Sequence, residues 1–300
     1  MAISRRPART TPGAKGVGQE DLSLKRIQYP NGSSNQYLKF FASFGVTVVA
    51  QREQLQGDCP FLDCKKEGHF YASSASGLWD CKRCGKSGNI FTFMSFLHTS
   101  HNRVMTEKDY NWIAKQRPGI SITTLKKYGI CRFGPSSVLI PSYNLEGKIA
   151  SLPIWRELSN PDNTVSHRIL NPPIVKAALF GLQFVKSASS VYICEGQWDM
   201  LALHSAFSTV TVKAKPLLSV SSLLAVPGAG TFPQQHLSLL DNRDIFILFD
   251  NDSAGLKGVE SLLNAISRHG VTPRKIQSLA WPTHYPTHFD IRDLISKGVQ

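Results

Sequence analysis

Short, largely apolar segments alternate with helical patterns along the last third of the chain. The predicted strands are residues 191–194, 223–226, 245–249 and 275–280. The segment 245–249 is apolar at every position, as expected for a strand that is covered on both faces of a parallel sheet. Strands that alternate with helices favour a parallel sheet with helices packed on its faces. The pattern therefore predicts an α/β domain with a mixed, mostly parallel sheet over residues 186–300.

Apolar spacing and turn residues before residue 186 predict short helices and one hairpin. Apolar residues recur at helical spacing in 35–44, 90–99 and 120–128. Residues 138–156 predict strands around a turn at 144–147, and the polar stretch 159–167 predicts an exposed loop.

These patterns suggest the domain boundaries. We expect a small β domain at 34–99, a charged linker at 100–119 and a basic subdomain at 120–185. Residues 1–33 are rich in Arg, Pro, Gly and Ser and have no acidic residue before Glu20, which predicts a disordered basic tail. Its composition overlaps with that of an organelle transit peptide, but a solvated tail in a cytoplasmic protein is the favoured interpretation.

Charge indicates the class of partner. The chain has 34 Lys and Arg against 21 Asp and Glu, a net charge of +13, and residues 1–118 alone carry 17 against nine. This excess favours nucleic acid over a membrane, because no segment approaches the ~18 consecutive apolar residues that span a bilayer. Gly85-Lys86-Ser87 resembles the end of a phosphate-binding loop, but Asp80 stands where that loop needs its first glycine, so no ATP-driven motor is expected.

Four of the six cysteines form two pairs around a predicted hairpin, Cys59 with Cys64 and Cys81 with Cys84. Clustering favours a metal over disulfides, and a reducing compartment. Two such pairs supply the tetrahedral sulfur shell that zinc prefers, and a ribbon of this size depends on the metal to fold. The first pair has a loose C-x4-C spacing, so His69 is an alternative to Cys64 as the fourth ligand.

Cations and rings alternate around these cysteines. Such a mixture is typical of a surface for single-stranded nucleic acid, where charges pair with phosphates and rings stack on bases. The alternative is that Phe70 and Trp79 form the small core of the ribbon. The residues concerned are Lys65, Lys66, Lys82, Arg83, Lys86, His69, Phe70, Tyr71 and Trp79.

Carboxylates follow two of the predicted strands. Glu195 comes directly after 191–194, and Asp250 and Asp252 come after 245–249. Ligands collect at the carboxyl ends of parallel strands, and converging carboxylates repel each other unless a cation lies between them. Mg²⁺ suits a few carboxylate oxygens together with phosphates. The alternative for Asp250 to Asp252 is a turn that caps the following helix.

Together these motifs resemble the zinc-ribbon and TOPRIM DNA primases of bacteria and phages, here in a stand-alone form without a helicase domain. The zinc domain of that family resembles Cys59-Pro60-Phe61 with Cys81 to Cys84. The TOPRIM signature resembles Glu195-Gly196, Asp250-Asn251-Asp252 and the closing Asp290-x-x-Asp293-Leu294. The resemblance covers about residues 50 to 295, and the two domains in this order are more specific than either motif alone. The family more often has a Cys or His at the position of Leu62, so the second zinc ligand differs here.

The resemblance implies primer synthesis on single-stranded DNA from NTPs, with one structural zinc and two catalytic Mg²⁺ or Mn²⁺ ions. It implies that Glu195, Asp250 and Asp252 are catalytic ligands, with Asp290 and Asp293 nearby. Basic residues would hold the triphosphate and the template, namely Arg156, Arg168, Lys176, Lys82 and Arg83. A separate replicative helicase is an expected partner. A TOPRIM nuclease and a catalytically silent single-stranded DNA-binding protein are the rival hypotheses.

Overall fold

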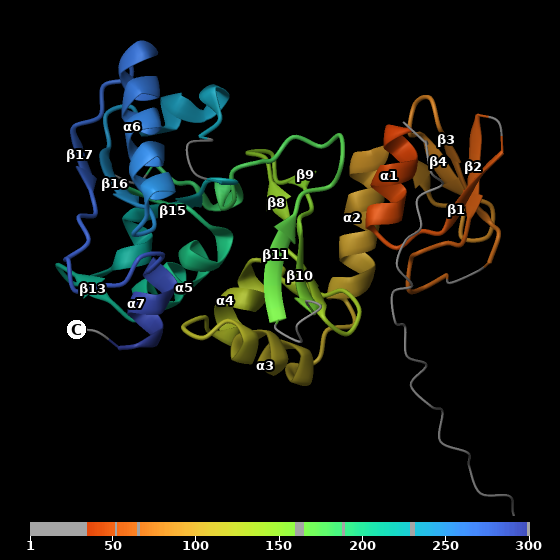
Figure 1. Cartoon of the computed structure of the whole chain (residues 1–300), viewed down its shortest axis with the longest axis horizontal. Helices are drawn as coiled ribbons and strands as arrows, with labels where there is room; N and C mark the ends of the chain where they lie inside the picture. The colour runs from red at the N-terminus through yellow and green to blue at the C-terminus, as the bar shows by residue number, and fades with distance from the viewer. Residues whose placement is uncertain are drawn as a thin grey trace, which may run out of the picture.

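The computed structural model describes residues 35–51, 53–64, 67–159, 165–187, 190–228 and 232–298. The expected tail at 1–33, Lys65, Lys66 and much of the loop expected at 159–167 lie outside the described residues. Figure 1 shows three parts in a row: a ribbon domain on the right, a small sheet with two helices in the middle, and an α/β domain on the left.

The ribbon domain is a five-stranded antiparallel sheet with two helices packed against one of its faces. Its elements are α1 (Gln36–Ser43), β1 (Val48–Gln51), β2 (Gln54–Gly57), β3 (Phe70–Ser73), β4 (Trp79–Cys81), β5 (Ser87–Gly88) and α2 (Ile90–Asn102), and the strands follow chain order. Asn35 and Asn89 begin the two helices, because each side chain accepts two backbone N–H groups that have no partner inside the helix. Strand alternation places Phe70, Ala72 and Trp79 on the inner face, where Phe93 of α2 packs on them.

The middle part forms a four-stranded antiparallel sheet in the order β11-β10-β7-β6. The predicted hairpin is present, because β7 pairs with β10. Between them β8 pairs with β9 around the predicted turn at 144–147. The elements are α3 (Glu107–Gln116), α4 (Ile122–Lys127), β6 (Cys131–Arg132), β7 (Ser137–Leu139), β8 (Ser142–Tyr143), β9 (Ile149–Ser151), β10 (Ile154–Ser159) and β11 (Val165–Leu170).

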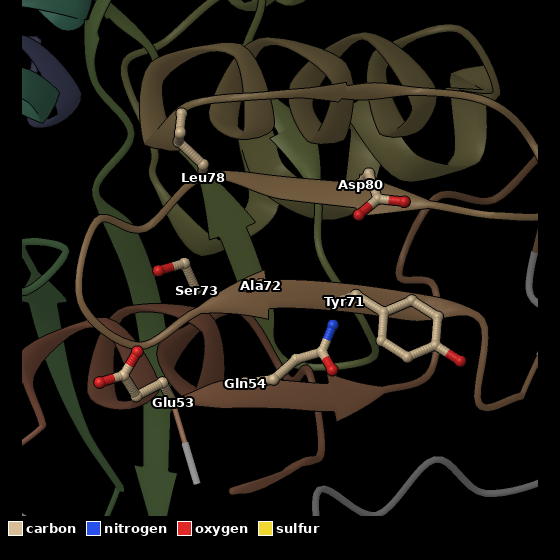
Figure 2. Close-up of a pocket in the computed structure, with 7 residues that line it drawn as sticks. All are labelled: Glu53, Gln54, Tyr71, Ala72, Ser73, Leu78 and Asp80. Carbon is tan, nitrogen blue, oxygen red and sulfur yellow. The ribbon is translucent and has the colours of Figure 1, made fainter. Parts of the chain in front are cut away.

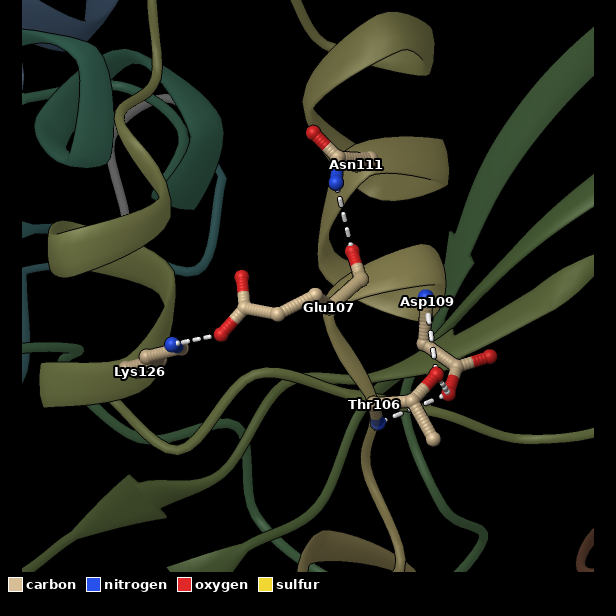
Figure 3. A network of polar contacts seen from close by, with 5 residues as sticks. All are labelled: Thr106, Glu107, Asp109, Asn111 and Lys126. Atoms are coloured by element: carbon tan, nitrogen blue, oxygen red, sulfur yellow. Dashed lines mark hydrogen bonds and ion pairs between the residues drawn. The ribbon is translucent and has the colours of Figure 1, made fainter.

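The segment expected as a linker contains a packed helix, α3. Thr106 and Asp109 form a reciprocal capping box at its start, and Glu107 pairs with Lys126 of α4 (Figure 3). Tyr110 and Ile113, three residues apart on one face, are buried in the core. The charge-rich composition concealed this face, because charged residues are as numerous as apolar ones in the segment.

The α/β domain contains the predicted parallel sheet, in the order β15-β12-β16-β17. An isolated antiparallel bridge, Phe180 with Ala225, flanks it. The elements are β12 (Ser190–Cys194), α5 (Gln197–Phe207), β13 (Thr211–Val212), β14 (Lys215–Pro216), β15 (Ser221–Ala225), β16 (Asp244–Leu248), α6 (Ser253–Arg268), β17 (Lys275–Ser278) and α7 (Ile291–Ser296), with short 3₁₀ turns at Leu182–Phe184, Leu217–Ser219 and Gln234–Leu240.

Two apolar layers cover this sheet. Val191 and Ile193 pack with Leu262 and Ile266 of α6 on one face, and Cys194 packs with α5 on the other. The layer under α5 continues into the middle part through Tyr110, Trp155 and neighbouring residues. The ribbon core is likewise continuous with Leu139 and Ile154 of the middle sheet. The α/β fold class and the ribbon predicted from sequence are both confirmed.

Candidate functional site

The carboxylates predicted after β12 and β16 meet at one edge of the sheet. The parallel register pairs Cys194 with Leu248, so Glu195 and Asp250 follow on neighbouring strands. Glu195 accepts a hydrogen bond from the backbone N–H of Asp250 at 3.2 Å through Oε2. This contact fixes the glutamate carboxylate beside the start of the Asp-Asn-Asp turn.

The turn after β16 is shaped by a glycine and a helix cap. A Cβ on Gly255 would lie 2.3 Å from the carbonyl oxygen of Asp250, so only glycine lets the first turn of α6 approach this closely. Asp252 caps the helix by accepting the Gly255 N–H at 2.7 Å. The capping alternative is therefore correct for Asp252, whereas Asp250 is not part of the cap.

The carboxyl groups at this edge differ in the direction of their pKa shifts. Burial, together with the charges of Glu195, Asp290 and Asp252, raises the pKa of Asp250 to about 7. Burial is also the main cause that raises the pKa of Glu195. The pKa of Asp252 is lowered, first by the Gly255 N–H and then by His288, whose Nδ1 lies 2.8 Å from Oδ2. Without a cation, Asp250 and Glu195 therefore keep a proton more readily than Asp252 does.

The closing acidic motif lies at the start of α7. Asp290 caps this helix, accepting the Asp293 N–H at 2.6 Å, and accepts Arg292 Nη2 at 2.9 Å. Asp293 lies 3.7 Å from the same guanidinium and is more exposed. The protein's own cation therefore partly neutralises both carboxylates, and Asp290 is the one that acts on Asp250.

Sequence reasoning missed three charged residues here, Asp199, Arg292 and Arg117. Asp199, in the first turn of α5, is 8% exposed, and burial followed by the charge of Asp290 raises its pKa well above the usual value. A Cβ on Gly196 would lie 2.5 Å from its Oδ2, so this glycine makes room for the carboxylate. The available signal was a lone acid in an otherwise apolar helix, three residues after Glu195-Gly196.

Arg117 connects this cluster to the middle sheet. Its guanidinium carbon lies 4.7 Å from the ring centre of Trp155 on β10 and 5.6 Å from that of Trp198 on α5. Burial and the charge of Arg292 lower its pKa to about 10, against the opposing effect of Asp199 and Asp290. The other end of this stack is His167, whose ring lies 4.9 Å from Trp155.

The loop before α7 closes around the acidic turn. Asn251 donates to the carbonyl oxygens of Tyr285 and Pro286, and Trp281 donates to the carbonyl oxygen of Phe249 at 2.8 Å. His288 has φ 64°, a left-handed conformation that is unusual for a residue other than glycine, and it contacts Asp252. The protein therefore holds the acidic turn in place with its own hydrogen bonds.

The acids suit a hard divalent cation. Asp250 and Glu195 carry charge that the surrounding groups do not fully neutralise, and carboxylate oxygens are the donors that Mg²⁺ or Mn²⁺ takes. Among the described residues, only the four cysteines form a group with every ligand atom within 4.8 Å of the others. The acids at the sheet edge are therefore spread more widely than the four cysteines.

The four cysteines of the ribbon converge on one point. The Sγ atoms of Cys64 and Cys81 are 3.8 Å apart, and zinc–sulfur bonds of about 2.3 Å in a tetrahedron give sulfur separations of about 3.8 Å. Burial, with added effects from neighbouring sulfurs, raises the pKa of Cys59 and of Cys84. Burial also acts on Cys81, but backbone N–H groups of the knuckle oppose it and lower its pKa.

This donor set fits a zinc site made of four thiolates. His69, the alternative ligand, is exposed and is not part of the group. Cys59 and Cys81 are buried, and all four cysteines lie in or against the ribbon core. The cluster thus joins both knuckles to the core of the domain.

The predicted phosphate-binding cations of the middle part have different surroundings. Arg156 donates to the carbonyl oxygen of Ser43 at 2.9 Å, which joins β10 to the end of α1. Arg168, its partner in the neighbouring strand, and Lys176 are both exposed. The structure therefore gives Arg156 a role between domains and leaves the other two side chains accessible.

In the ribbon, Lys82 and Arg83 are exposed at the second knuckle, and Lys82 pairs with Asp80 at 2.7 Å. Phe70 and Trp79 are 0% and 3% exposed, so the alternative that assigned them to the ribbon core is confirmed. They are inaccessible to nucleic-acid bases.

Comparisons with known proteins agree with this architecture. Residues 192–285 match the family model described as Toprim-like. The chain is 27% identical over 143 residues to an uncharacterized protein of Mycoplasma genitalium, covering 46% of this chain and 59% of that protein, so it spans little more than half of that relative's length. No helix among the described residues is long and apolar enough to cross a membrane.

Two solved primase structures show the same fold. The E. coli primase catalytic core matches with a TM-score of 0.51 at 16% identity, over 70% of this chain and 76% of that one. The DnaG primase catalytic domain bound to single-stranded DNA matches with a TM-score of 0.52 at 16% identity, over 70% and 74%. The Aquifex aeolicus primase, with zinc-binding and RNA polymerase domains, aligns over 87% of this chain and 80% of that one, with a TM-score of 0.46 and 17% identity. Residues 192–285 are therefore a Toprim-like domain, in a chain that has the fold of primase catalytic cores and a four-cysteine cluster in its ribbon.

Proposed function

We propose that this protein is a primase-type nucleotidyltransferase that synthesises short RNA primers on a single-stranded DNA template. The observation that supports this best is the meeting of Glu195 and Asp250 at the carboxyl edge of the parallel sheet, where the pKa of Asp250 rises to about 7. Such a cluster of incompletely neutralised acids favours divalent cations. In the matching DnaG structure, the same fold binds single-stranded DNA.

Glu195, Asp250 and Asp252 would hold the ions, with Asp290 and Asp293 assisting. When bound, two such ions lower the pKa of an attacking 3′-hydroxyl and neutralise a leaving pyrophosphate. The raised pKa of Glu195 also suits it to accept the hydroxyl proton. Arg168 and Lys176 are exposed cations that would pair with triphosphate or template phosphates, and Lys82 and Arg83 would contact the template from the ribbon. A separate replicative helicase remains an expected partner.

Incubating the protein with a single-stranded oligonucleotide, labelled NTPs and Mg²⁺ tests this function. We expect short labelled RNA. Cut template would instead indicate a nuclease, and a gel shift without product would indicate a silent DNA-binding protein. Asp250→Asn should reduce product at least about 100-fold while leaving the circular dichroism spectrum unchanged. Glu260→Gln, an exposed change on α6, is the matched control, and equal loss in both variants would contradict the assignment.

A further inference from the structure

The outer face of the ribbon sheet has a groove of about 490 Å³. Alternation along β3 and β4 turns Tyr71, Ser73 and Asp80 away from the aromatic core, and Figure 2 shows these side chains together on the outer face. Glu53, Ser73 and Leu78 lie toward one end, and Tyr71 and Asp80 lie toward the other. The described residues that line it are Glu53, Gln54, Tyr71, Ala72, Ser73, Leu78 and Asp80.

The groove is acidic on a strongly basic protein. Among the residues that the structure describes, its lining includes two carboxylates and no Lys or Arg, although the whole chain has a net charge of +13. Lys82 pairs with Asp80 from outside the lining, which leaves Glu53 as the more available carboxylate. Leu78 adds an apolar contact, because 58% of it is exposed. These features favour a ligand that is cationic and partly apolar, and they disfavour a phosphate backbone.

The chain itself enters the ribbon at the Glu53 end of this groove. The Asn35 side chain donates to the carbonyl oxygen of Ser74 at 3.0 Å, and the Ser74 N–H and hydroxyl both donate to the carbonyl oxygen of Glu53 at 2.8 Å. Tyr37 packs over Gly77 of the β3–β4 turn, since a Cβ there would lie 2.3 Å from its ring. Asn35, the first residue that the structure describes, therefore lies beside the Glu53 end of the groove.

The preceding segment has the matching chemistry. Residues 1–34 contain six Lys and Arg against two acids. Within them, Lys25-Arg26-Ile27-Gln28-Tyr29 combines two cations with two apolar side chains. Lys25 is ten residues before Asn35, and an extended chain of ten residues spans at most about 35 Å, so this stretch can reach the groove.

We propose that the chain's own residues 24–29 dock in this groove, with Lys25 paired to Glu53 and the apolar side chains against Leu78. The tether raises the effective concentration of the segment, so a short contact with few ion pairs suffices. This inference does not depend on the proposed function, because it concerns only the ribbon and the segment before it.

Zero-length carbodiimide crosslinking of the full-length protein, followed by peptide mass spectrometry, tests the docking. We expect a crosslink from Lys25 to Glu53, lost in Glu53→Gln and in Lys25→Arg, whose guanidinium does not react. Glu146→Gln, an exposed acid in a distant turn, should leave it unchanged. The Lys82–Asp80 pair, 2.7 Å apart, is the internal positive control. No Lys25–Glu53 product, while the control forms, would overturn the proposal.

Limited trypsinolysis gives an independent readout. Docking protects the bond after Arg26, so Glu53→Gln should accelerate cleavage there at least threefold relative to cleavage after Arg9. Equal relative rates in the native protein and the variant would overturn docking. A Lys25–Glu53 crosslink found only in a covalent dimer would assign the groove to a second copy. Weaker oligo-dT binding by Glu53→Gln, without faster cleavage, would assign it to nucleic acid.

Discussion

The two candidate metal centres of this protein are built in opposite ways. The ribbon ligands, Cys59 to Cys84, lie within one short stretch and converge inside a small aromatic core. The acids at the sheet edge come from three separate segments between Glu195 and Asp293, and helix caps, backbone N–H groups and Arg292 hold them. We expect the cysteine centre to depend on its ion for its shape, as small zinc domains do. The other is held by protein contacts, so its fold should persist without an ion.

The largest effect is expected when zinc ligands are removed from the ribbon. Cys81→Ser with Cys84→Ser should abolish binding of one zinc equivalent, and the ribbon should unfold, because structural zinc contributes on the order of 10 kcal/mol. Zinc content by atomic absorption and hydrogen exchange of residues 53–101 measure both effects. Cys131→Ala, away from the cluster, is the control. A retained equivalent of zinc would refute the site.

Removal of Arg292 tests whether protein contacts hold the acidic edge. Arg292→Met leaves Asp290 and buried Asp199 without their cation, and we expect a loss of about 3 kcal/mol in urea unfolding. Arg274→Met, which breaks the more exposed pair with Asp244, should cost less than about 1 kcal/mol. Similar costs for the two variants would mean that Arg292 does not neutralise a buried cluster.

The raised pKa of Asp250 predicts that the stability of the fold depends on pH when divalent ions are absent. Its pKa is about 7 when folded against 3.8 ordinarily, so the folded chain binds the proton more tightly. This contribution to stability is fully present below about pH 4 and is lost as the pH rises to 7, at most a few kcal/mol. In EDTA, Asp250→Asn should therefore gain stability over the native protein between pH 5 and pH 8. Parallel thermal unfolding profiles for the two proteins would exclude this effect.

The smallest expected effect separates the two roles of Asp252. Asp252→Asn keeps a side-chain cap for α6, whereas Asp252→Ala loses it and should cost about 1 kcal/mol. If Asp252 also binds Mg²⁺, both variants lose primer synthesis but only the alanine variant loses stability. Full activity in the Asn variant would assign Asp252 to capping alone.

The sequence by itself determined the features that depend on neighbours along the chain. Cysteine spacing predicted the metal ribbon, and strands ending in Glu195 and Asp250 predicted the acidic edge, because parallel strands present their carboxyl ends together. Apolar spacing likewise predicted helices at 35–44 and 90–99, where the structure has α1 and α2.

Only the tertiary structure decided which groups neutralise or bury one another. Arg292 approaches Asp199, Arg117 lies over the rings of Trp155 and Trp198, and Arg156 bonds to Ser43. None of these pairings follows from spacing, since each joins elements whose packing is set by apolar faces elsewhere. Burial and distance fix pKa and charge pairing, and both arise only when the three parts of the chain pack together.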